Sequence, residues 1–317
     1  MSTANIPTLI RLVSASVCVA KRAGLIVKNV LNKGPANLGK IDKGVDDFST
    51  EADRRAQRCI VASLSKGFPK ITIIGEEELD PNDPEQDGIC QDLDSTVLSH
   101  ECPARFQSIK EEDIVVWVDP LDGTREFAQG LLEEVTILIG IAINGEPVSG
   151  VVHQPYYQYK VGKDPFNLGR TMWGIVGLGG FGIDKKDPPA NGPVIVTTRS
   201  HRSKLVDDTL LALKPTNDLR VGGAGNKVLY VIEGKAHAYV YPSPGTKKWD
   251  TCAPQAILHS LGGRMTDIYG NEILYHKDAE YPNVGGILAA HSEEANQAFC
   301  KNIPEHVKEE LKQQTTR

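Results

Sequence analysis

The sequence predicts a mixed α/β (α+β) protein, and three observations carry this prediction. The chain opens with apolar residues at helical spacing, its middle contains apolar runs that end on glycine or acidic residues, and its last third alternates the two kinds of pattern. Spacings of about 3.6 and 2 residues distinguish amphipathic helices from half-buried strands, and their alternation is typical of α/β architectures. With 317 residues, of which 40% are hydrophobic, the chain can fill a large core.

The N-terminal region is predicted to form two helices and a strand. Apolar residues recur at helical spacing from Thr8 to Val30, and the pattern stops at residues 32–35, Asn-Lys-Gly-Pro. A second amphipathic helix is expected after Thr50, because a threonine side chain can cap the free N–H groups of the first turn. The strand follows at Ile71–Ile74 and ends on residues 75–78, Gly-Glu-Glu-Glu.

The middle of the chain is predicted to add strands around an irregular segment. Residues 79–112 are rich in Asp, Glu, Pro and Ser and have no sustained period, so we expect a surface insertion there. Residues 114–118 have the pattern of a buried strand, and a short helix is expected after Thr124. Two further strands, 136–143 and 148–152, flank an Asn-Gly turn, which is a strong hairpin signal.

The second half is expected to form a separate domain. Residues 174–182 are rich in glycine and residues 187–193 in proline, which is typical of connecting segments. We therefore predict an N-terminal α+β domain at residues 1–190 and a C-terminal α/β domain at residues 191–317. In the latter, the patterns alternate at 194–197 (strand), 204–213 (helix), 226–233 (helix), 236–241 (strand), 251–261 (helix) and 285–290 (strand).

Charge and cysteine content argue against several classes of partner. A formal net charge of −6 disfavours the wrapping of nucleic acid, because nonspecific binding to that polyanion is supplied mainly by Lys and Arg. The N-terminus has no basic region followed by a long apolar run, so neither a signal peptide nor a membrane span is expected. The 6 cysteines form no CxxC pair, which favours reduced thiols over disulfides or a zinc site. We expect a cytoplasmic monomer.

The most informative feature is a set of acidic residues at predicted strand ends and helix starts. A buried carboxylate is costly unless a cation or another partner meets it. Magnesium prefers oxygen ligands in octahedral geometry and keeps several waters. Carboxylates drawn from separate segments therefore predict a hydrolytic magnesium site, and the residues concerned are Asp53, Glu76, Asp119, Asp122 and Asp250.

Residues 119–124, Asp-Pro-Leu-Asp-Gly-Thr, combine features of a metal site and a phosphate site. Two aspartates three residues apart can share adjacent cations, and Leu121 can add its backbone carbonyl. Gly123 permits a tight turn, after which the amides of Gly123 and Thr124 open a helix whose N-terminus can hold a phosphate. One short run can thus bind metal and substrate together.

Three motifs together resemble the signature of the lithium-inhibited, magnesium-dependent phosphatases of the inositol monophosphatase superfamily. They are Gly75-Glu76-Glu77, the run at 119–124, and Trp249-Asp250 followed by Gly262-Gly263. The similarity extends over essentially the whole chain. It implies the layered α/β/α/β/α sandwich of the inositol monophosphatase and fructose-1,6-bisphosphatase type.

The same resemblance implies roles for individual residues. Asp53 and Thr124 would orient and deprotonate the water that attacks a phosphomonoester directly and in line, without a phosphoenzyme. Lithium would inhibit by taking one magnesium position. Two or three Mg²⁺ ions would be bound by Glu76, Asp119, the carbonyl of Leu121, Asp122 and Asp250.

Several segments resemble the bisphosphate nucleotidases of this superfamily, namely residues 197–201, 221–227 and 247–254. This likeness implies removal of the 3′- or 2′-phosphate from adenosine 3′,5′-bisphosphate, to give AMP and phosphate. It implies 3′-phosphoadenosine 5′-phosphosulfate and inositol 1,4-bisphosphate as further substrates. His201 and Lys227 can meet the 5′-phosphate. The implied substrate contacts are Thr124, Thr198, His201, Gly223, Lys227 and Asp250.

Two alternatives stay open at this point. An inositol polyphosphate 1-phosphatase would share the metal cluster but would need more polar pocket walls than adenine does. A catalytically silent metal or phosphometabolite sensor is disfavoured by the intact Asp53, Glu76 and Thr124. The glycine loop at 222–225 permits close approach of the backbone to a ring, which favours a nucleotide. Other members place an arginine where this chain has residues 238–241, Ala-Tyr-Val-Tyr, so the likeness does not supply every 5′-phosphate contact.

Overall fold

The N-terminal helices follow the predicted pattern closely. A computed structural model of the chain describes residues 5–34, 38–44, 47–80, 87–161 and 168–315. Helix α1 (Thr8–Asn32) buries one face along its length, and α2 (Glu51–Gly67) begins where the Thr50 hydroxyl accepts a hydrogen bond from Ala52 N at 3.2 Å. The two helices pack side by side. A small hairpin of β1 (Ile41–Gly44) and β2 (Asp47–Ser49) connects them.

The first sheet has six strands in sequence order, and its first pair is parallel while the others are antiparallel. The predicted hairpin with its Asn-Gly turn is confirmed as its third and fourth strands. The strands are β3 (Thr72–Gly75), β4 (Ile114–Asp122), β5 (Thr136–Ile143), β6 (Glu146–Gln154), β7 (Arg170–Ile175) and β8 (Gly179–Phe181).

The second sheet has the order β10-β9-β11-β13-β12. Its first three strands run parallel to one another, and the last two are antiparallel to their neighbours. The strands are β9 (Val194–Thr198), β10 (Asn217–Val221), β11 (Ala238–Tyr241), β12 (Arg264–Thr266) and β13 (Ile287–Ala290). The sequence patterns did not indicate β10, which is partly exposed, or β12, which has only 3 residues although Met265 and Thr266 are buried.

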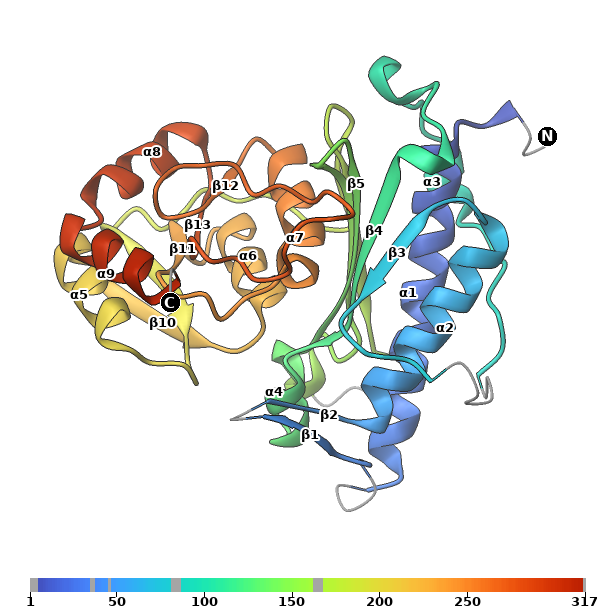
Figure 1. The fold of residues 1–317 in the computed structure, drawn as a ribbon, viewed down its shortest axis with the longest axis horizontal. Helices are drawn as coiled ribbons and strands as arrows, with labels where there is room; N and C mark the ends of the chain where they lie inside the picture. Colours follow the sequence, from blue (N-terminus) through green and yellow to red (C-terminus); the bar gives the residue numbers. More distant parts are fainter. Residues whose placement is uncertain (1–4, 35–37, 45–46, 81–86, 162–167, 316–317) are drawn as a thin grey trace.

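The helices complete a five-layered arrangement. Figure 1 shows α1 and α2 on the outer face of the first sheet, α6 (Ala224–Ile232) and α7 (Lys248–Ser260) between the two sheets, and a third group outside the second sheet. This outer group is α5 (Lys204–Leu213), α8 (Glu293–Asn302) and α9 (Glu305–Thr315). The expected α/β/α/β/α sandwich is therefore confirmed. The division at residues 190 and 191 stays a prediction.

The glycine-rich segment 174–182 is not a connection, as the sequence suggested, but contributes β7 and β8. The reason is close packing against α7 and the residues that follow it. A Cβ on Gly174 would lie 2.4 Å from the Ser260 hydroxyl oxygen, and a Cβ on Gly180 would lie 2.8 Å from Leu261 Cγ. These glycines let the middle helix layer lie directly on the sheet, so their abundance reflects packing.

The segment 79–112 is only partly a surface excursion, which corrects the expectation. Residues 81–86 lie outside the described residues. Further along, the Ser14 hydroxyl donates to the Asp94 carbonyl at 3.0 Å, a short helix α3 (Ser95–Leu98) follows, and Val97 and Phe106 are buried. The segment therefore adds to the core beside α1. Among the described helices, none has a stretch long and apolar enough to span a membrane.

Candidate active site

Three predicted metal ligands meet between the two sheets. Asp119 and Asp122 lie at the end of β4, and Asp250 is the third residue of α7. Each offers a carboxylate oxygen, and these three oxygens all lie within 4.8 Å of one another. Asp119 and Asp122 are buried. The arrangement arises because α7 crosses the first sheet with its N-terminal end beside the end of β4.

Backbone amides and one hydroxyl hold these carboxylates in place. Asp119 Oδ1 accepts from Leu121 N at 2.9 Å, and Asp250 Oδ2 accepts from Lys247 N at 2.6 Å. Asp122 uses both oxygens: Oδ1 accepts from Ala224 N at 2.7 Å, and Oδ2 accepts from Gly225 N at 2.8 Å. Amide donors stabilise the ionised form of each carboxyl group, so the site is built to keep negative charge inside the protein.

Glu76 directly follows β3 and lies close enough to the three aspartates to interact with Asp250 electrostatically. Its backbone N–H donates to the Val118 carbonyl at 3.1 Å, which continues the parallel pairing of β3 with β4. The Lys43 ammonium lies 3.7 Å from Glu76 Oε1 and 2.5 Å from Glu77 Oε1. Lys43 could not be predicted from the sequence, because nothing in the local pattern of a short hairpin strand indicates which distant carboxylates it meets.

The pKa values of the clustered carboxyl groups are raised, which favours their neutral, protonated form. Burial, and then the charge of Asp250, raise the pKa of Glu76 to about 8. Burial, and then the charge of Asp122, raise the pKa of Asp250 to about 6. The pKa of Asp119 is raised well above its usual range by burial and by Glu76. Several buried carboxylates that repel one another fit a hard divalent cation, which supplies the missing countercharge with oxygen-only coordination.

Asp53 and Thr124 are hydrogen-bonded to each other. Asp53 is buried on the first turn of α2, where its Oδ2 accepts from Thr50 N at 2.8 Å and also from the Thr50 hydroxyl. The Thr124 hydroxyl lies 3.0 Å from Asp53 Oδ1 and 3.1 Å from the Leu121 carbonyl oxygen, both of which can accept its proton. Burial raises the pKa of Asp53 to about 6. Thr124 is therefore oriented by acceptors, which leaves its oxygen lone pairs for a donor.

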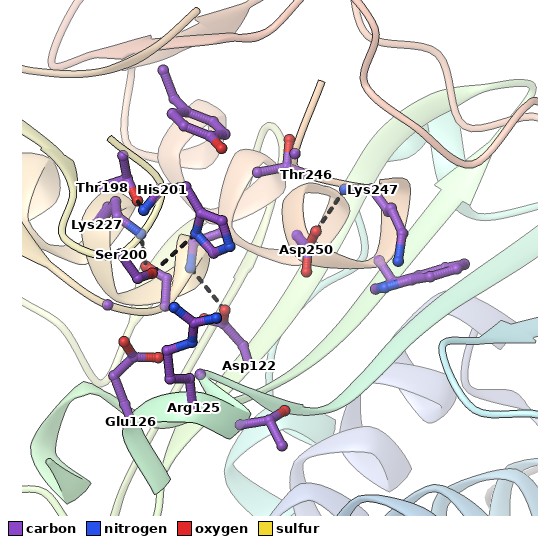
Figure 2. A pocket seen from close by; sticks show the side chains of 18 of the residues that line it. Asp122, Arg125, Glu126, Thr198, Ser200, His201, Lys227, Thr246, Lys247 and Asp250 are labelled. Carbon is purple, nitrogen blue, oxygen red and sulfur yellow. Dashed lines mark hydrogen bonds between the residues drawn. The ribbon is translucent and has the colours of Figure 1, made fainter. Parts of the chain in front are cut away.

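A cavity of about 320 Å³ opens beside these carboxylates. Figure 2 shows Asp122 and Asp250 on one side and Thr198, His201 and Lys227 on another. Of the eleven residues predicted for the site, eight line this cavity: Glu76, Asp122, Thr124, Thr198, His201, Gly223, Lys227 and Asp250. The other three, Asp53, Asp119 and Leu121, lie directly behind it in the contacts already described. Their individual roles stay predictions.

The predicted substrate residues come from the end of β9 and the start of α6. The Thr198 hydroxyl accepts from His201 N at 3.1 Å, which sets the turn after β9. Lys227 Nζ donates to the Gly223 carbonyl at 3.0 Å and lies 5.5 Å from the centre of the Tyr239 ring. Lys227 is buried, and this lowers the pKa of its ammonium. Its charge is directed at the cavity and at Asp122.

The glycine loop at 222–225 packs closely against the first half of the chain, and the expected approach of its backbone to a ligand ring stays a prediction. A Cβ on Gly222 would lie 2.1 Å from Glu126 Cδ, and a Cβ on Gly225 would lie 2.7 Å from Leu138 Cδ2. Gly223 has φ +70°, which favours glycine. These glycines bring the loop against the first sheet and α4 (Thr124–Ala128), so that its amides reach Asp122.

Sequence reasoning missed several residues of the site. Thr136 donates to Asp122 Oδ2 at 2.7 Å, Arg199 bridges Glu126 and Glu134, and the cavity wall also contains Phe48, Tyr239, Tyr241, Thr246, Lys247 and Trp249. Thr136 could have been found from the hairpin register, because it lies opposite Asp122 in β5. Lys247 and Trp249 lie in segments that the resemblance covered, but the sequence did not indicate that they line the cavity. The remaining residues have no local signal, since their partners are far away in the sequence.

Comparison with known proteins gives a consistent result. Residues 10–308 match the family described as the inositol monophosphatase family. A rat protein named 3′(2′),5′-bisphosphate nucleotidase 1 is 50% identical over 304 residues, covering 96% of this chain and 97% of the relative. The human protein of the same name is 49% identical over 312 residues, covering 98% and 99%. Extragenic suppressor protein suhB from Bartonella henselae superposes with a TM-score of 0.66 at 21% identity, over 92% of this chain and 98% of that chain.

Proposed function

Because this chain belongs to the inositol monophosphatase family and is a phosphatase, we propose that it removes the 3′- or 2′-phosphate from adenosine 3′,5′-bisphosphate, releasing AMP and phosphate. The observation that carries the nucleotide assignment is the aromatic part of the cavity wall, where Tyr239, Tyr241 and Trp249 stand beside the buried carboxylates. Flat aromatic surfaces suit a purine ring better than a polyol. Bisphosphate nucleotidases with about half of their residues identical to this chain support the same substrate class.

The metal requirement rests on the donor set. Two or three Mg²⁺ ions would be held by Glu76, Asp119, the Leu121 carbonyl, Asp122 and Asp250. When bound, magnesium would supply countercharge for the carboxylates and for the oxygens of the reacting phosphate. The raised pKa values of Glu76 and Asp250 support this proposal, because burial and neighbouring carboxylates outweigh the lysines near these acids.

Asp53 and Thr124 would orient the attacking water. The Thr124 hydroxyl donates its proton toward Asp53 or toward the Leu121 carbonyl, so its lone pairs can accept a proton from water. Asp53 then receives the proton that Thr124 passes on, and a pKa of about 6 suits a general base near neutral pH. Water would attack the phosphorus in line, and the sugar oxygen would leave from the opposite side and take a proton from solvent to become the hydroxyl of AMP. No covalent intermediate with the chain is needed.

The rest of the substrate would lie along the wall formed by β9 and α6. Thr198, Gly223, the Lys227 ammonium and the His201 imidazole would contact the ribose and the 5′-phosphate, while Thr124 and Asp250 would contact the phosphate that leaves. The same wall would accept 3′-phosphoadenosine 5′-phosphosulfate, whose 5′ end is also anionic, and more weakly inositol 1,4-bisphosphate. We also propose that the enzyme is a cytoplasmic monomer, and the six free thiols support a reducing compartment.

Phosphate release tests the proposal. Adenosine 3′,5′-bisphosphate and inositol 1,4-bisphosphate are assayed in parallel with Mg²⁺, with Mg²⁺ plus millimolar LiCl, and with Mg²⁺ plus excess chelator. The expected result is preference for the nucleotide and loss of activity with lithium or chelator. Preference for the inositol compound would overturn the substrate and favour an inositol polyphosphate 1-phosphatase. Activity that survives chelation would overturn the metal requirement.

A further inference from the structure

Arg199 connects two parts of the active site that belong to different sheets. It follows Thr198 at the end of β9, and its guanidinium reaches across to the first half of the chain. We propose that Arg199 is a positioning residue that holds the substrate-binding wall at a fixed distance from the helix that begins with Thr124. The inference rests on the proposed function, because it assigns the wall to the nucleotide part of the substrate.

The contacts of Arg199 all lead to the segment that follows the metal-binding run. Its Nη2 lies 2.6 Å from Glu126 Oε1, and its Nη1 lies 3.5 Å from Glu134 Oε1. Glu126 is on α4 and its side chain is only 5% exposed. A buried carboxylate that loses its cationic partner is costly. The ion pair with Glu126 therefore strongly favours the observed position of the guanidinium.

Glu134 extends the connection to the second wall segment. Its other oxygen, Oε2, accepts a hydrogen bond from Gly222 N at 2.5 Å. Gly222 in turn accepts from the Asn226 side chain at 3.1 Å, and the neighbouring Gly223 carbonyl accepts from Lys227 Nζ at 3.0 Å. One ion-pair network therefore fixes both the turn after β9 and the start of α6.

The network sets the separation between α4 and the turn after β9, which form opposite sides of the cavity. Figure 2 shows Arg125 and Glu126 on α4 facing Thr198, Ser200 and His201 across the cavity. The two sides are joined in sequence only through more than 70 intervening residues, as the separation of 73 between Arg199 and Glu126 shows. A planar guanidinium that binds two carboxylates provides directional restraint that a flexible ammonium cannot.

The proposal predicts a split between two kinds of ligand. AMP lacks the phosphate that is transferred and therefore reports on the wall, whereas inorganic phosphate reports on the metal half. Arg199→Met should raise the inhibition constant of AMP and the KM of the bisphosphate about tenfold, equivalent to ~1.4 kcal/mol. It should leave the inhibition constant of phosphate within about twofold, a difference of only a few tenths of a kcal/mol. For Arg199→Lys, the inhibition constant of AMP and the KM should lie between those of Arg199→Met and those of the parent.

A second variant separates positioning from direct contact with the ligand. Glu134→Gln removes a partner of Arg199 but no group that faces AMP, and its amide oxygen can still accept from Gly222 N. If Arg199 acts by position, Glu134→Gln weakens AMP binding in the same direction, and the double variant is no weaker than the Arg199 variant alone. Unchanged or tighter AMP binding in Glu134→Gln would overturn the proposal.

Two neighbours serve as matched controls. Arg202→Met removes an exposed arginine of the same turn that pairs with Asp207 at 3.0 Å, and Glu133→Gln changes the residue beside Glu134, which pairs with Lys160 at 3.5 Å. Both should bind AMP as the parent does. Equal weakening of AMP and phosphate in Arg199→Met would show a general structural defect and would also overturn the proposal. A parent enzyme that ignores the nucleotide would instead contradict the proposed function.

Discussion

The Thr136 hydroxyl donates a 2.7 Å hydrogen bond to Oδ2 of Asp122, directly across the β4–β5 pair. The same oxygen accepts from Gly225 N at 2.8 Å, so a strand residue and a helix amide fix one carboxylate from two sides. Thr136 is fully buried. A carboxylate held in this way keeps one orientation, and groups behind a metal ligand, the role proposed for Asp122, commonly tune affinity for the metal.

We expect Thr136→Val to weaken metal activation with little change of fold. Valine has nearly the shape of threonine but cannot donate, so Asp122 loses one of its three hydrogen bonds. The Mg²⁺ concentration that gives half-maximal activity should rise roughly tenfold or more, and the unfolding free energy should fall by about 1 kcal/mol. Titration of activity with Mg²⁺ and urea denaturation measure the two effects. A Thr136→Ser variant should stay near the parent, and a valine variant with the parent's Mg²⁺ dependence would contradict the argument.

Asp119→Asn should abolish turnover and stabilise the metal-free protein at the same time. A carboxyl group whose pKa is raised in the folded state, as burial and Glu76 do for Asp119, destabilises the fold at neutral pH, because the unfolded chain carries that group ionised at no such cost. The amide removes that charge but keeps an acceptor for Leu121 N. We expect kcat to fall by about 10³-fold or more, because the lost charge is a ligand charge.

Thermal unfolding checks the second half of that prediction. In chelator at pH 7.5, Asp119→Asn should melt above the parent, whereas added Mg²⁺ should raise the parent's melting temperature more than the variant's, by mass action on the folded state. Asp218→Asn is the control, since Asp218 pairs at the surface with Arg220 at 2.8 Å. A variant that melts below the parent in chelator would contradict the charge argument.

Gly150→Ala should displace α7 and with it Asp250. A Cβ on Gly150 would lie 2.1 Å from the Ala253 carbonyl oxygen, a backbone atom one turn beyond Asp250 in the same helix. Overpacking of this kind costs about 3 kcal/mol, and activity should fall even where the variant is folded. Gly67→Ala is the control, because a Cβ there meets nothing within 4 Å. Urea unfolding and specific activity below the transition measure both effects, and parental values for both would rule out this contact.

Acid destabilisation should depend on His153. The ring is buried between α1 and the first sheet, with Nδ1 2.8 Å from the Thr171 hydroxyl oxygen, and burial lowers its pKa from 6.5 to about 3. In the unfolded chain His153 is protonated as the pH falls below 6.5, whereas in the folded state it stays neutral until the pH approaches 3. The contribution of the neutral His153 to the free energy of unfolding is therefore fully present above pH 6.5 and is lost as the pH falls toward 3. At pH 5 the free energy of unfolding should be lower by about 2 kcal/mol.

The comparison of His153→Gln with His306→Gln tests this pH dependence. The glutamine at 153 removes the titrating group, so the difference in unfolding free energy between pH 8 and pH 5 should become smaller than in the parent. His306 is exposed at the surface near Asp208, so its replacement should change that difference much less than His153→Gln does. Equal pH dependence in the parent and in His153→Gln would show that other groups control acid unfolding.

The sequence alone determined the elements whose causes are local. The helix from Thr8, the cap at Thr50, the hairpin around the Asn-Gly turn and the run at 119–124 were all predictable, because propensity, capping and turn chemistry involve residues within a few positions of one another. The resemblance carried by three motifs extended this to the layered fold, which the structure confirms. The eleven candidate site residues also came from the sequence.

Only the tertiary structure decided what holds those residues in place. Asp122 meets Ala224 N across a separation of 102 residues, and Arg199 meets Glu126 across 73. The glycines at 174 and 180 look like a flexible connection in the sequence. In the fold they lie in strands of the first sheet, and α7 and the residue after it pack directly against them. Contacts of this kind depend on how sheets and helices pack, and periodicity along the chain carries no information about which distant residues will face each other.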